Sequence, residues 1–92
     1  MSRTILNNNT ERHRYELIDD GKLVCFSEYD LTGRAVRFLH TEVVQGHEGK
    51  GYGSVLAKQT LDDVRAQHKK VIPICEFIAG YIRKHGEYAD LI

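Results

Sequence analysis

The sequence is poor in cysteine and proline. Cys25 and Cys75 are its only cysteines and Pro73 its only proline, among 92 residues. Two separated cysteines cannot build a framework of several disulfides and lack the clustered spacing of a zinc site. We therefore expect free thiols and no bound metal. The short length and the lack of any Pro/Ser-rich linker predict one continuous domain over residues 1–92.

No charge of one sign prevails. Thirteen basic and thirteen acidic side chains cancel at pH 7, and the longest basic run is the Lys69-Lys70 pair. This distribution argues against binding to nucleic acid or to an anionic membrane, so any anionic ligand must be held locally. The N-terminal MSRTILNNNT lacks the apolar segment of a signal peptide, and no run of about 18 apolar residues occurs. We expect a cytoplasmic monomer.

The first half of the sequence has the pattern of an antiparallel meander. Polar and apolar residues alternate from Arg12 to Ile18, and the Asp-Gly dipeptide that follows is typical of a tight hairpin. Lys22 to Tyr29 is rich in β-forming residues, and a second glycine turn leads into the extended run Ala35 to Val44. Three strands are predicted.

The second half alternates helices with one short strand. Val55, Leu56, Leu61 and Val64 fall at helical spacing within SVLAKQTLDDVRAQHKK, which contains no glycine or proline. Val71 to Cys75 is a short apolar run that suits a buried strand. The segment EFIAGYIRKHG then places an apolar stripe on a second helix that stops near Gly86. The predicted class is α+β, in the order β-β-β-α-β-α.

The segment HEGKGYGS, His47 to Ser54, places three glycines between the third strand and the long helix. Glycines let a phosphate approach backbone N–H groups, and a helix N-terminus favours negative charge. The spacing matches neither G-x-x-x-x-G-K-[ST] nor G-x-G-x-x-G. From this stretch alone, an anion cradle and a simple tight turn are equally acceptable interpretations.

A wider pattern identifies a family. EGKGYGSVL resembles the pyrophosphate-binding motif Q/R-x-x-G-x-G/A of the GNAT acetyltransferase superfamily, with Gly51 and Gly53 at its small positions and Glu48 in place of Gln or Arg. HTEV, PIC and YIRKHGEYADLI, from Tyr81 to Ile92, are similar to the minimal GNAT-like proteins, except that Gly86 stands where proline is frequent. The resemblance covers Tyr15 to the C-terminus. It implies one GNAT-like N-acetyltransferase domain with three layers.

The resemblance also implies the position of acetyl-CoA. Its pyrophosphate would lie on the amides of the glycine loop, and its pantetheine between the third strand and a strand splayed beside it. Backbone N–H groups exposed there would serve as an oxyanion donor. The residues expected to contact acetyl-CoA are Val43, Val44, Glu48, Gly49, Lys50, Gly51, Tyr52, Gly53, Ser54, Cys75 and Tyr81.

Cys75 and His40 are the candidate catalytic residues. Cys75 lies directly before the second predicted helix, where the helix dipole stabilises a thiolate, so it can accept an acyl group or simply line the cleft. Alternation places His40 on one face with Val36, Phe38 and Glu42. If that strand lies beside Cys75, His40 can take a proton from the thiol or from an attacking amine; a structural histidine is the alternative. Tyr81 also belongs to the apolar stripe, so packing is the alternative to a role as general acid.

Two functions are consistent with these residues. The first is an N-acetyltransferase that moves an acetyl group from acetyl-CoA to an amine, directly or through Cys75. The turn DDG, Asp19 to Gly21, leaves no room for the helices that shape the acceptor site in longer superfamily members. The second function is therefore a CoA-binding or acyl-CoA-binding module without turnover. The sequence does not identify the acceptor, which can be a protein lysine, an N-terminus or a small amine.

Overall fold

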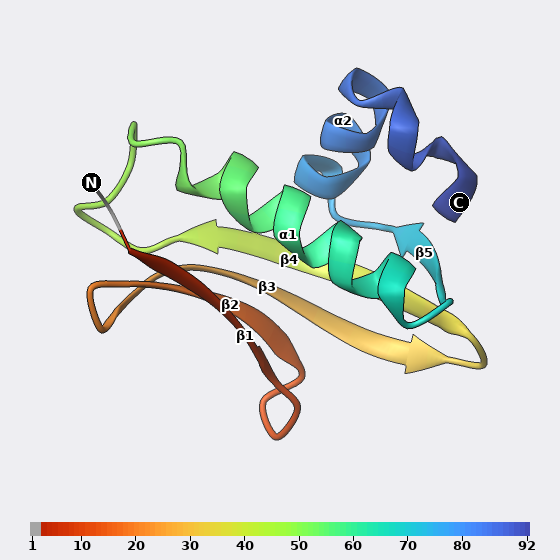
Figure 1. Ribbon diagram of the computed structural model, residues 1–92, viewed down its shortest axis with the longest axis horizontal. Helices are drawn as coiled ribbons and strands as arrows, with labels where there is room; N and C mark the ends of the chain where they lie inside the picture. Colours follow the sequence, from red (N-terminus) through yellow and green to blue (C-terminus); the bar gives the residue numbers. More distant parts are fainter. Residues whose placement is uncertain (1–2) are drawn as a thin grey trace.

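A computed structural model describes residues 3–92 as one mixed sheet with helices packed on it (Figure 1). The elements in chain order are β1 (Thr4–Asn9), β2 (Arg14–Asp19), β3 (Lys22–Thr32), β4 (Ala35–Val43), α1 (Tyr52–Ala66), β5 (Lys70–Pro73), α2 (Glu76–Lys84) and the 3₁₀-helix η1 (Gly86–Leu91). The α+β class predicted from the sequence is confirmed. Within residues 3–92, no helix is long and apolar enough to cross a membrane.

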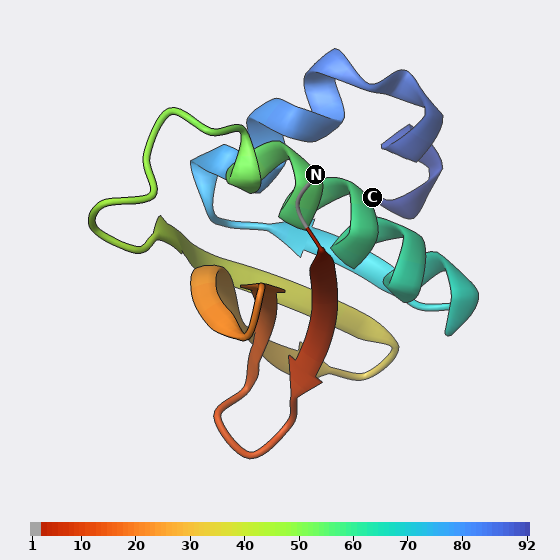
Figure 2. The same ribbon diagram turned by 60° about the vertical axis from the view of Figure 1, so that its left-hand side comes forward.

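The five strands lie in the order β1-β2-β3-β4-β5. The first four form an antiparallel meander, and β5 pairs in parallel with β4 after the crossover through α1. Helices α1, α2 and η1 pack on one face of this sheet (Figure 2). The opposite face, which we call the open face, carries exposed side chains such as Glu28 and Glu42. The described chain therefore has two layers, not the three that the resemblance implied.

The core lies between the helices and the inner face of the sheet. Alternate residues of a strand point to one face, so Tyr15 and Leu17 of β2 are both buried. Helix α1 contributes Leu56, Leu61 and Val64 to this core. They are fully buried because they lie on the helix face that packs on the sheet. Burial of these side chains is the main force that holds α1 across the sheet.

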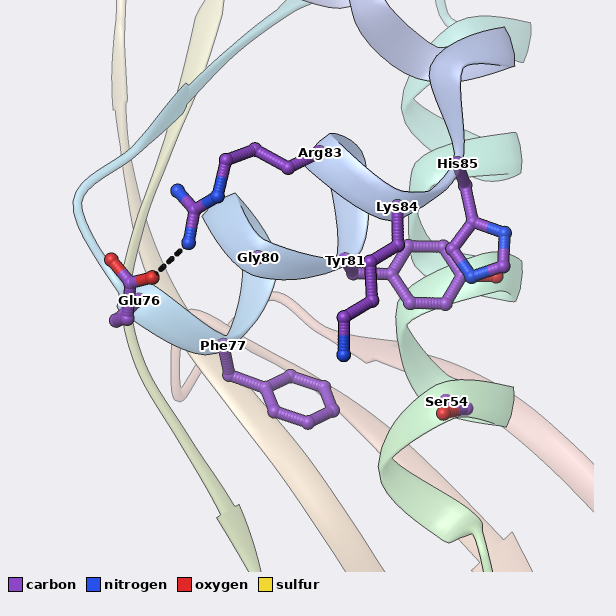
Figure 3. Close-up of a pocket in the computed structure, with 8 residues that line it drawn as sticks. All are labelled: Ser54, Glu76, Phe77, Gly80, Tyr81, Arg83, Lys84 and His85. Carbon is purple, nitrogen blue, oxygen red and sulfur yellow. Dashed lines mark hydrogen bonds and ion pairs between the residues drawn. The ribbon is translucent and has the colours of Figure 1, made fainter.

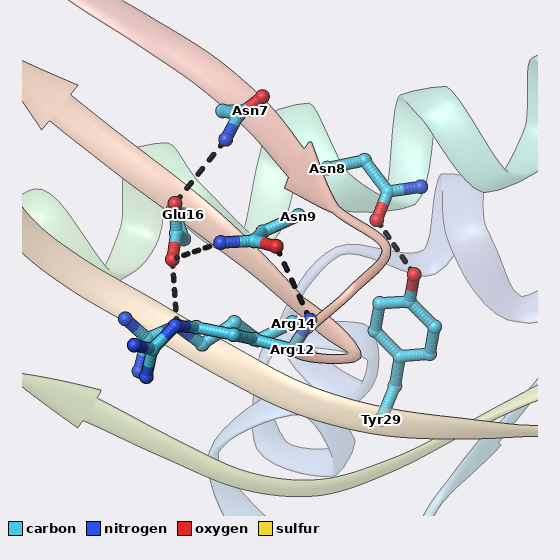
Figure 4. A network of polar contacts seen from close by, with 7 residues as sticks. All are labelled: Asn7, Asn8, Asn9, Arg12, Arg14, Glu16 and Tyr29. Carbon is cyan, nitrogen blue, oxygen red and sulfur yellow. Dashed lines mark hydrogen bonds and ion pairs between the residues drawn. The ribbon is translucent and has the colours of Figure 1, made fainter.

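Strand β1 was not predicted, because TILNNN ends in three asparagines, which are poor strand formers. Tertiary contacts override that local preference. Asn8 faces the helices and accepts a hydrogen bond from the Tyr29 hydroxyl at 2.6 Å. Asn7 and Asn9 point to the open face and donate to the Glu16 carboxylate at 3.2 and 3.1 Å (Figure 4).

Arg14 completes this network, because its Nε donates to Glu16 at 2.6 Å and its guanidinium lies 4.5 Å from the Phe26 ring centroid. Burial alone would raise the pKa of Glu16, but the hydrogen bonds from Arg14, Asn7 and Asn9 together lower it. The part of the open face over β1 and β2 is thus largely polar, with Ile5 as an exposed apolar exception.

A β-bulge in β4 changes which side chains reach the helices. Tyr29 pairs with Phe38 and Glu28 with His40, so Leu39 is an extra residue without a partner on β3. Leu39 and His40 are consequently both exposed, whereas Thr41 points inward beside the buried Ser27. The predicted alternation, with His40 on the face of Phe38, is wrong beyond this bulge.

Strands β4 and β5 separate halfway along β4. Their pairing ends at Phe38 and Pro73, and the Cys75 amide donates the last hydrogen bond to the Phe38 carbonyl at 2.7 Å. The remainder of β4, His40 to Val43, therefore has β3 on one side and no strand on the other among the described residues. This opening, which we call the β4–β5 split, is the splayed arrangement that the family resemblance implied.

Candidate functional site

The glycine loop delivers the chain to α1 in a conformation that suits glycine. Gly51 is the N-cap of α1 with φ of 80°, and Gly49 has φ of 79°. A Cβ at either position would meet no atom within 4 Å, so the approach to the loop is unobstructed. The amides of Gly53 and Ser54 lie in the first turn of a 15-residue helix, where N–H groups have no intrahelical acceptor. This geometry suits an anion.

Glu48 stabilises the loop itself. Its Oε1 accepts a hydrogen bond from the Gly46 amide at 2.9 Å. The carboxylate thus holds a turn, and this contact accounts for an acidic residue where the family motif has Gln or Arg. Lys50 is exposed beside it, at the rim of the loop.

Gly53 has a packing role that its sequence position did not indicate. It is buried in the first turn of α1, and a Cβ there would lie 2.7 Å from Cζ of Phe77. Such a distance is shorter than any real Cβ contact, so a larger residue would displace the ring. Gly53 therefore allows the start of α2 to lie against the start of α1.

A cavity of about 370 Å³ lies along α2 and reaches the first turn of α1. Figure 3 shows its lining, which consists of Ser54 of α1 and Glu76, Phe77, Gly80, Tyr81, Arg83, Lys84 and His85 of α2 and its end. In this view the Lys84 side chain extends between the aromatic rings toward Ser54. Arg83 is paired with Glu76 across the cavity. Lys84 is thus the cation that extends into the space in front of the α1 N-terminus.

Tyr81 forms one wall of the cavity together with His85. The two rings are stacked, with centroids 4.0 Å apart and planes at 23°. Burial raises the pKa of Tyr81, and the Glu87 carboxylate adds to the effect. The phenol therefore stays protonated at neutral pH and can donate a hydrogen bond or a proton.

The β4–β5 split offers backbone groups next to this cavity. The Val44 amide donates to the Val24 carbonyl of β3 at 2.9 Å, so it is not directed to the split. Because neighbouring residues of a strand point their N–H groups to opposite sides, the Val43 amide faces the split instead. Of the two predicted contacts, the geometry favours Val43 over Val44.

Cys75 lies at the bottom of the split and is the N-cap of α2, as the sequence predicted. Its side chain is 9% exposed, and Sγ lies 3.3 Å from Thr41 Oγ1, to which it donates a hydrogen bond. Thr41 Oγ1 is also 2.9 Å from the buried Ser27 hydroxyl. The other free thiol, Cys25, is fully buried, and burial raises its pKa to about 11.

The His40 side chain does not lie beside Cys75. Its Nε2 lies 3.0 Å from Glu42 Oε1, and both side chains are exposed on the open face. The bulge at Leu39 causes this change, because it turns Thr41 toward the thiol in the place expected for His40. The prediction that His40 takes a proton from the Cys75 thiol is therefore wrong. The prediction that His40 takes a proton from an attacking amine is not affected, if the amine approaches from the open face.

The first turn of α1 is tied to the β2–β3 hairpin. The Tyr52 hydroxyl donates to Asp19 Oδ2, and the Tyr52 ring meets the His47 ring edge-on at 6.1 Å. Tyr52 thus anchors the loop through its side chain. Because the Tyr52 side chain is engaged in these contacts, the predicted contact of Tyr52 with acetyl-CoA would be made by its backbone.

Two of the predicted contact residues line the cavity together, along with residues that were not predicted. Ser54 and Tyr81 line one cavity, with the glycine loop at its edge. Phe77 and Lys84 were not predicted as site residues, although Phe77, Tyr81 and Lys84 share one helix face at spacings of four and three. That spacing was the available signal. Among residues 3–92, no group of three or more His, Cys, Asp or Glu side chains is placed to hold a metal ion.

Comparisons with known proteins agree with this geometry. Residues 14–91 match the family model of the GCN5-related N-acetyl-transferases. A solution structure of a GCN5-like putative N-acetyltransferase from Staphylococcus aureus superposes with a TM-score of 0.72 at 22% identity, covering 99% of this chain and 89% of that one. This likeness shows the shared fold. No curated protein matches the sequence. Since the family model spans most of the chain, the protein belongs to the GCN5-related N-acetyltransferase family.

Proposed function

We propose that the protein transfers the acetyl group of acetyl-CoA to a primary amine by direct attack of the amine. The observation that carries this proposal is the β4–β5 split, together with a cavity that runs along α2 from Glu76, directly after Cys75, and reaches Ser54 in the first turn of α1. The cosubstrate supplies an activated acetyl thioester. The chain supplies a place for an anion and, beside it, an uncovered strand edge.

The residues fit an elongated anionic ligand. Ser54 of the first turn of α1 and Lys84 line the same cavity, and a helix N-terminus with a nearby ammonium group suits a pyrophosphate. The apolar wall of Phe77 and Tyr81 suits a hydrocarbon chain leading to the split. At the split, the Val43 amide is positioned to donate to a carbonyl oxygen, which is the requirement for stabilising an oxyanion.

Direct transfer is favoured over a Cys75 acyl intermediate by the contacts of the thiol. Sγ is bonded to a hydroxyl, Thr41, and His40 lies on the other face of the sheet. The N-terminus of α2 can stabilise a thiolate at Cys75, but no imidazole lies beside the sulfur to take its proton among the described residues. We therefore assign Cys75 to the wall of the acyl site and His40 to the proton of the incoming amine.

Calorimetric titration with CoA tests the donor site. Wild-type protein should bind, and Lys84→Gln should weaken binding about tenfold, because a charge-assisted phosphate contact is lost. Lys69→Gln, in the loop between α1 and β5, is the control and should bind like wild type. Equal affinity of Lys84→Gln and wild type would contradict the assignment. Binding of acetyl-CoA without acetylation of any amine would identify a binding module instead of an enzyme.

A further inference from the structure

The open face beside the β4–β5 split differs from the polar surface over β1 and β2. Leu39, Ile72 and Ile74 are 40%, 39% and 55% exposed there. Ile72 alternates with the buried Val71 and therefore points away from the helices. Leu39 and Ile74 each directly follow the last pair of the parallel ladder, Phe38 and Pro73. We call these three residues the apolar shelf.

The bulge produces both the apolar shelf and its polar edge. A regular strand would direct only one of Leu39 and His40 to the open face, whereas the extra residue exposes both. The Glu42 carboxylate is bonded to His40, and Glu28 lies opposite His40 in the register. An imidazole is thus flanked by two exposed carboxylates at the edge of the shelf.

Two cations of this part of the face, Arg37 and Arg14, are already bound. Arg37, opposite Ile72, donates to both oxygens of Asp30 at 2.7 and 3.0 Å. Arg14, opposite Glu28, donates to Glu16 and lies over Phe26. These pairs leave the carboxylates of Glu28 and Glu42 to dominate the field at the edge of the shelf. Such a field attracts an ammonium group and repels a carboxylate.

We propose that the apolar shelf and the Glu28, His40 and Glu42 side chains form the acceptor site, and that they select a primary amine attached to an apolar group without a neighbouring carboxylate. This inference rests on the proposed function. The cavity lined by Ser54 and α2, which we call the donor cavity, lies on the helix face of the sheet. The apolar shelf lies on the open face, so the two substrates would meet at the β4–β5 split. A peptide lysine among apolar neighbours and a small arylalkyl amine share this chemistry; a free α-amino acid does not.

The proposed transfer replaces the C–S bond of the thioester with a C–N bond. The amine nitrogen forms a bond to the acetyl carbon, and the C–S bond breaks with its electron pair leaving on sulfur. The ammonium loses two protons in all: His40 takes one and releases it to solvent, and the other ends on the sulfur. Glu42 stabilises the imidazolium during this transfer.

Paired acceptors test the selection. With wild-type protein and saturating acetyl-CoA, phenethylamine should be acetylated with a kcat/KM at least tenfold above that of phenylalanine, which differs by one carboxylate. The capped peptide Leu-Lys-Leu distinguishes a peptide acceptor from a small amine, according to which has the higher kcat/KM. The double variant Glu28→Gln, Glu42→Gln should lose most of the discrimination against phenylalanine.

Leu31, an exposed leucine elsewhere in the sheet, provides a control for substitutions in the apolar shelf. Leu39→Ser should raise KM for phenethylamine several-fold with an unchanged KM for acetyl-CoA, whereas Leu31→Ser, at the far end of β3 and likewise exposed, should change neither. Equal rates with phenylalanine and phenethylamine, or equal effects of the two serine variants, would overturn the acceptor site and leave the proposed function standing. Acetyl-CoA binding without transfer to any of these amines would overturn both.

Discussion

The ring of Phe77 in α2 occupies the space where a side chain at Gly53 in α1 would begin. This contact joins the N-terminal ends of the two helices that line the donor cavity. It also separates the roles of two glycines in one motif. Gly51 is required by its backbone conformation, with φ of 80°, and Gly53 by packing.

Alanine substitutions should distinguish these two roles. Gly53→Ala should force the Phe77 ring aside, and this cost should offset the roughly 1 kcal/mol that alanine otherwise gains over glycine inside a helix. Gly51→Ala should cost about 1 kcal/mol, because a Cβ is strained at positive φ but meets no neighbour. Urea denaturation measures both changes. In the background Phe77→Ala, the cost of Gly53→Ala should largely vanish while that of Gly51→Ala persists; equal persistence of both would refute the packing role.

The two thiols should react at very different rates. Cys25 is fully buried with a pKa raised to about 11, so little thiolate forms near neutral pH. Cys75 is partly accessible at the start of α2. Iodoacetamide at pH 8 should label Cys75 at least tenfold faster than Cys25, as followed by peptide mass spectrometry. CoA should slow the labelling of Cys75, and labelling of Cys25 first would contradict this arrangement.

Much of this site was predictable because it depends on local chemistry. Glycines before a helix, and a cysteine between a strand and an amphipathic helix, are determined by neighbouring residues, and both predictions hold for Gly51 and Cys75. The face of His40 was not predictable in this way. Its orientation follows from the register of β4 against β3, and the single extra residue Leu39 reverses it.

Two other features depend on tertiary contacts. Strand β1 exists because Leu6 packs against the core and Asn8 meets Tyr29, neither of which the local pattern NNN reveals. The place of Lys84 in the donor cavity follows from how α2 lies against α1. An apolar stripe identifies the buried face of a helix but not which neighbour covers the adjoining positions.

Thr41 should be a stability determinant because it serves two buried neighbours. Thr41→Val leaves the fully buried Ser27 hydroxyl without this partner, which should lower the free energy of unfolding by about 1–3 kcal/mol. Thr41→Ser should retain most of the stability. In the double variant Ser27→Ala, Thr41→Val the loss should be smaller than the sum of the single losses, as chemical denaturation would show. Strict additivity would argue against the bond.

Stability should fall at alkaline pH. Burial raises the pKa of Tyr15 and of Tyr88 well above the ordinary value near 10, and their bonds to Asp63 and Asp62 add to the effect. Cys25 adds a smaller effect up to about pH 11. These groups ionise first in the unfolded chain, so the stability they contribute is complete below their ordinary pKa values and is lost as pH rises.

Urea midpoints measured from pH 7 to 11 should therefore decline above about pH 9. The decline should be shallower in Tyr15→Phe and Tyr88→Phe than in wild type, relative to each variant's own value at pH 7. A Tyr15→Phe profile parallel to that of wild type would show that this phenol does not control the alkaline transition.

The fate of the acetyl group distinguishes direct transfer from a covalent route. Direct attack predicts no acetyl mass on Cys75 after incubation with acetyl-CoA, because the thiol is bonded to Thr41 and has no base beside its sulfur among the described residues. Cys75→Ala should retain at least a third of the wild-type kcat with phenethylamine, since the oriented thioester and the strand-edge amide remain. His40→Gln should lower kcat and shift its pH profile in both backgrounds. An acetyl adduct that hydroxylamine removes, absent from Cys75→Ala together with all turnover, would establish the covalent route instead.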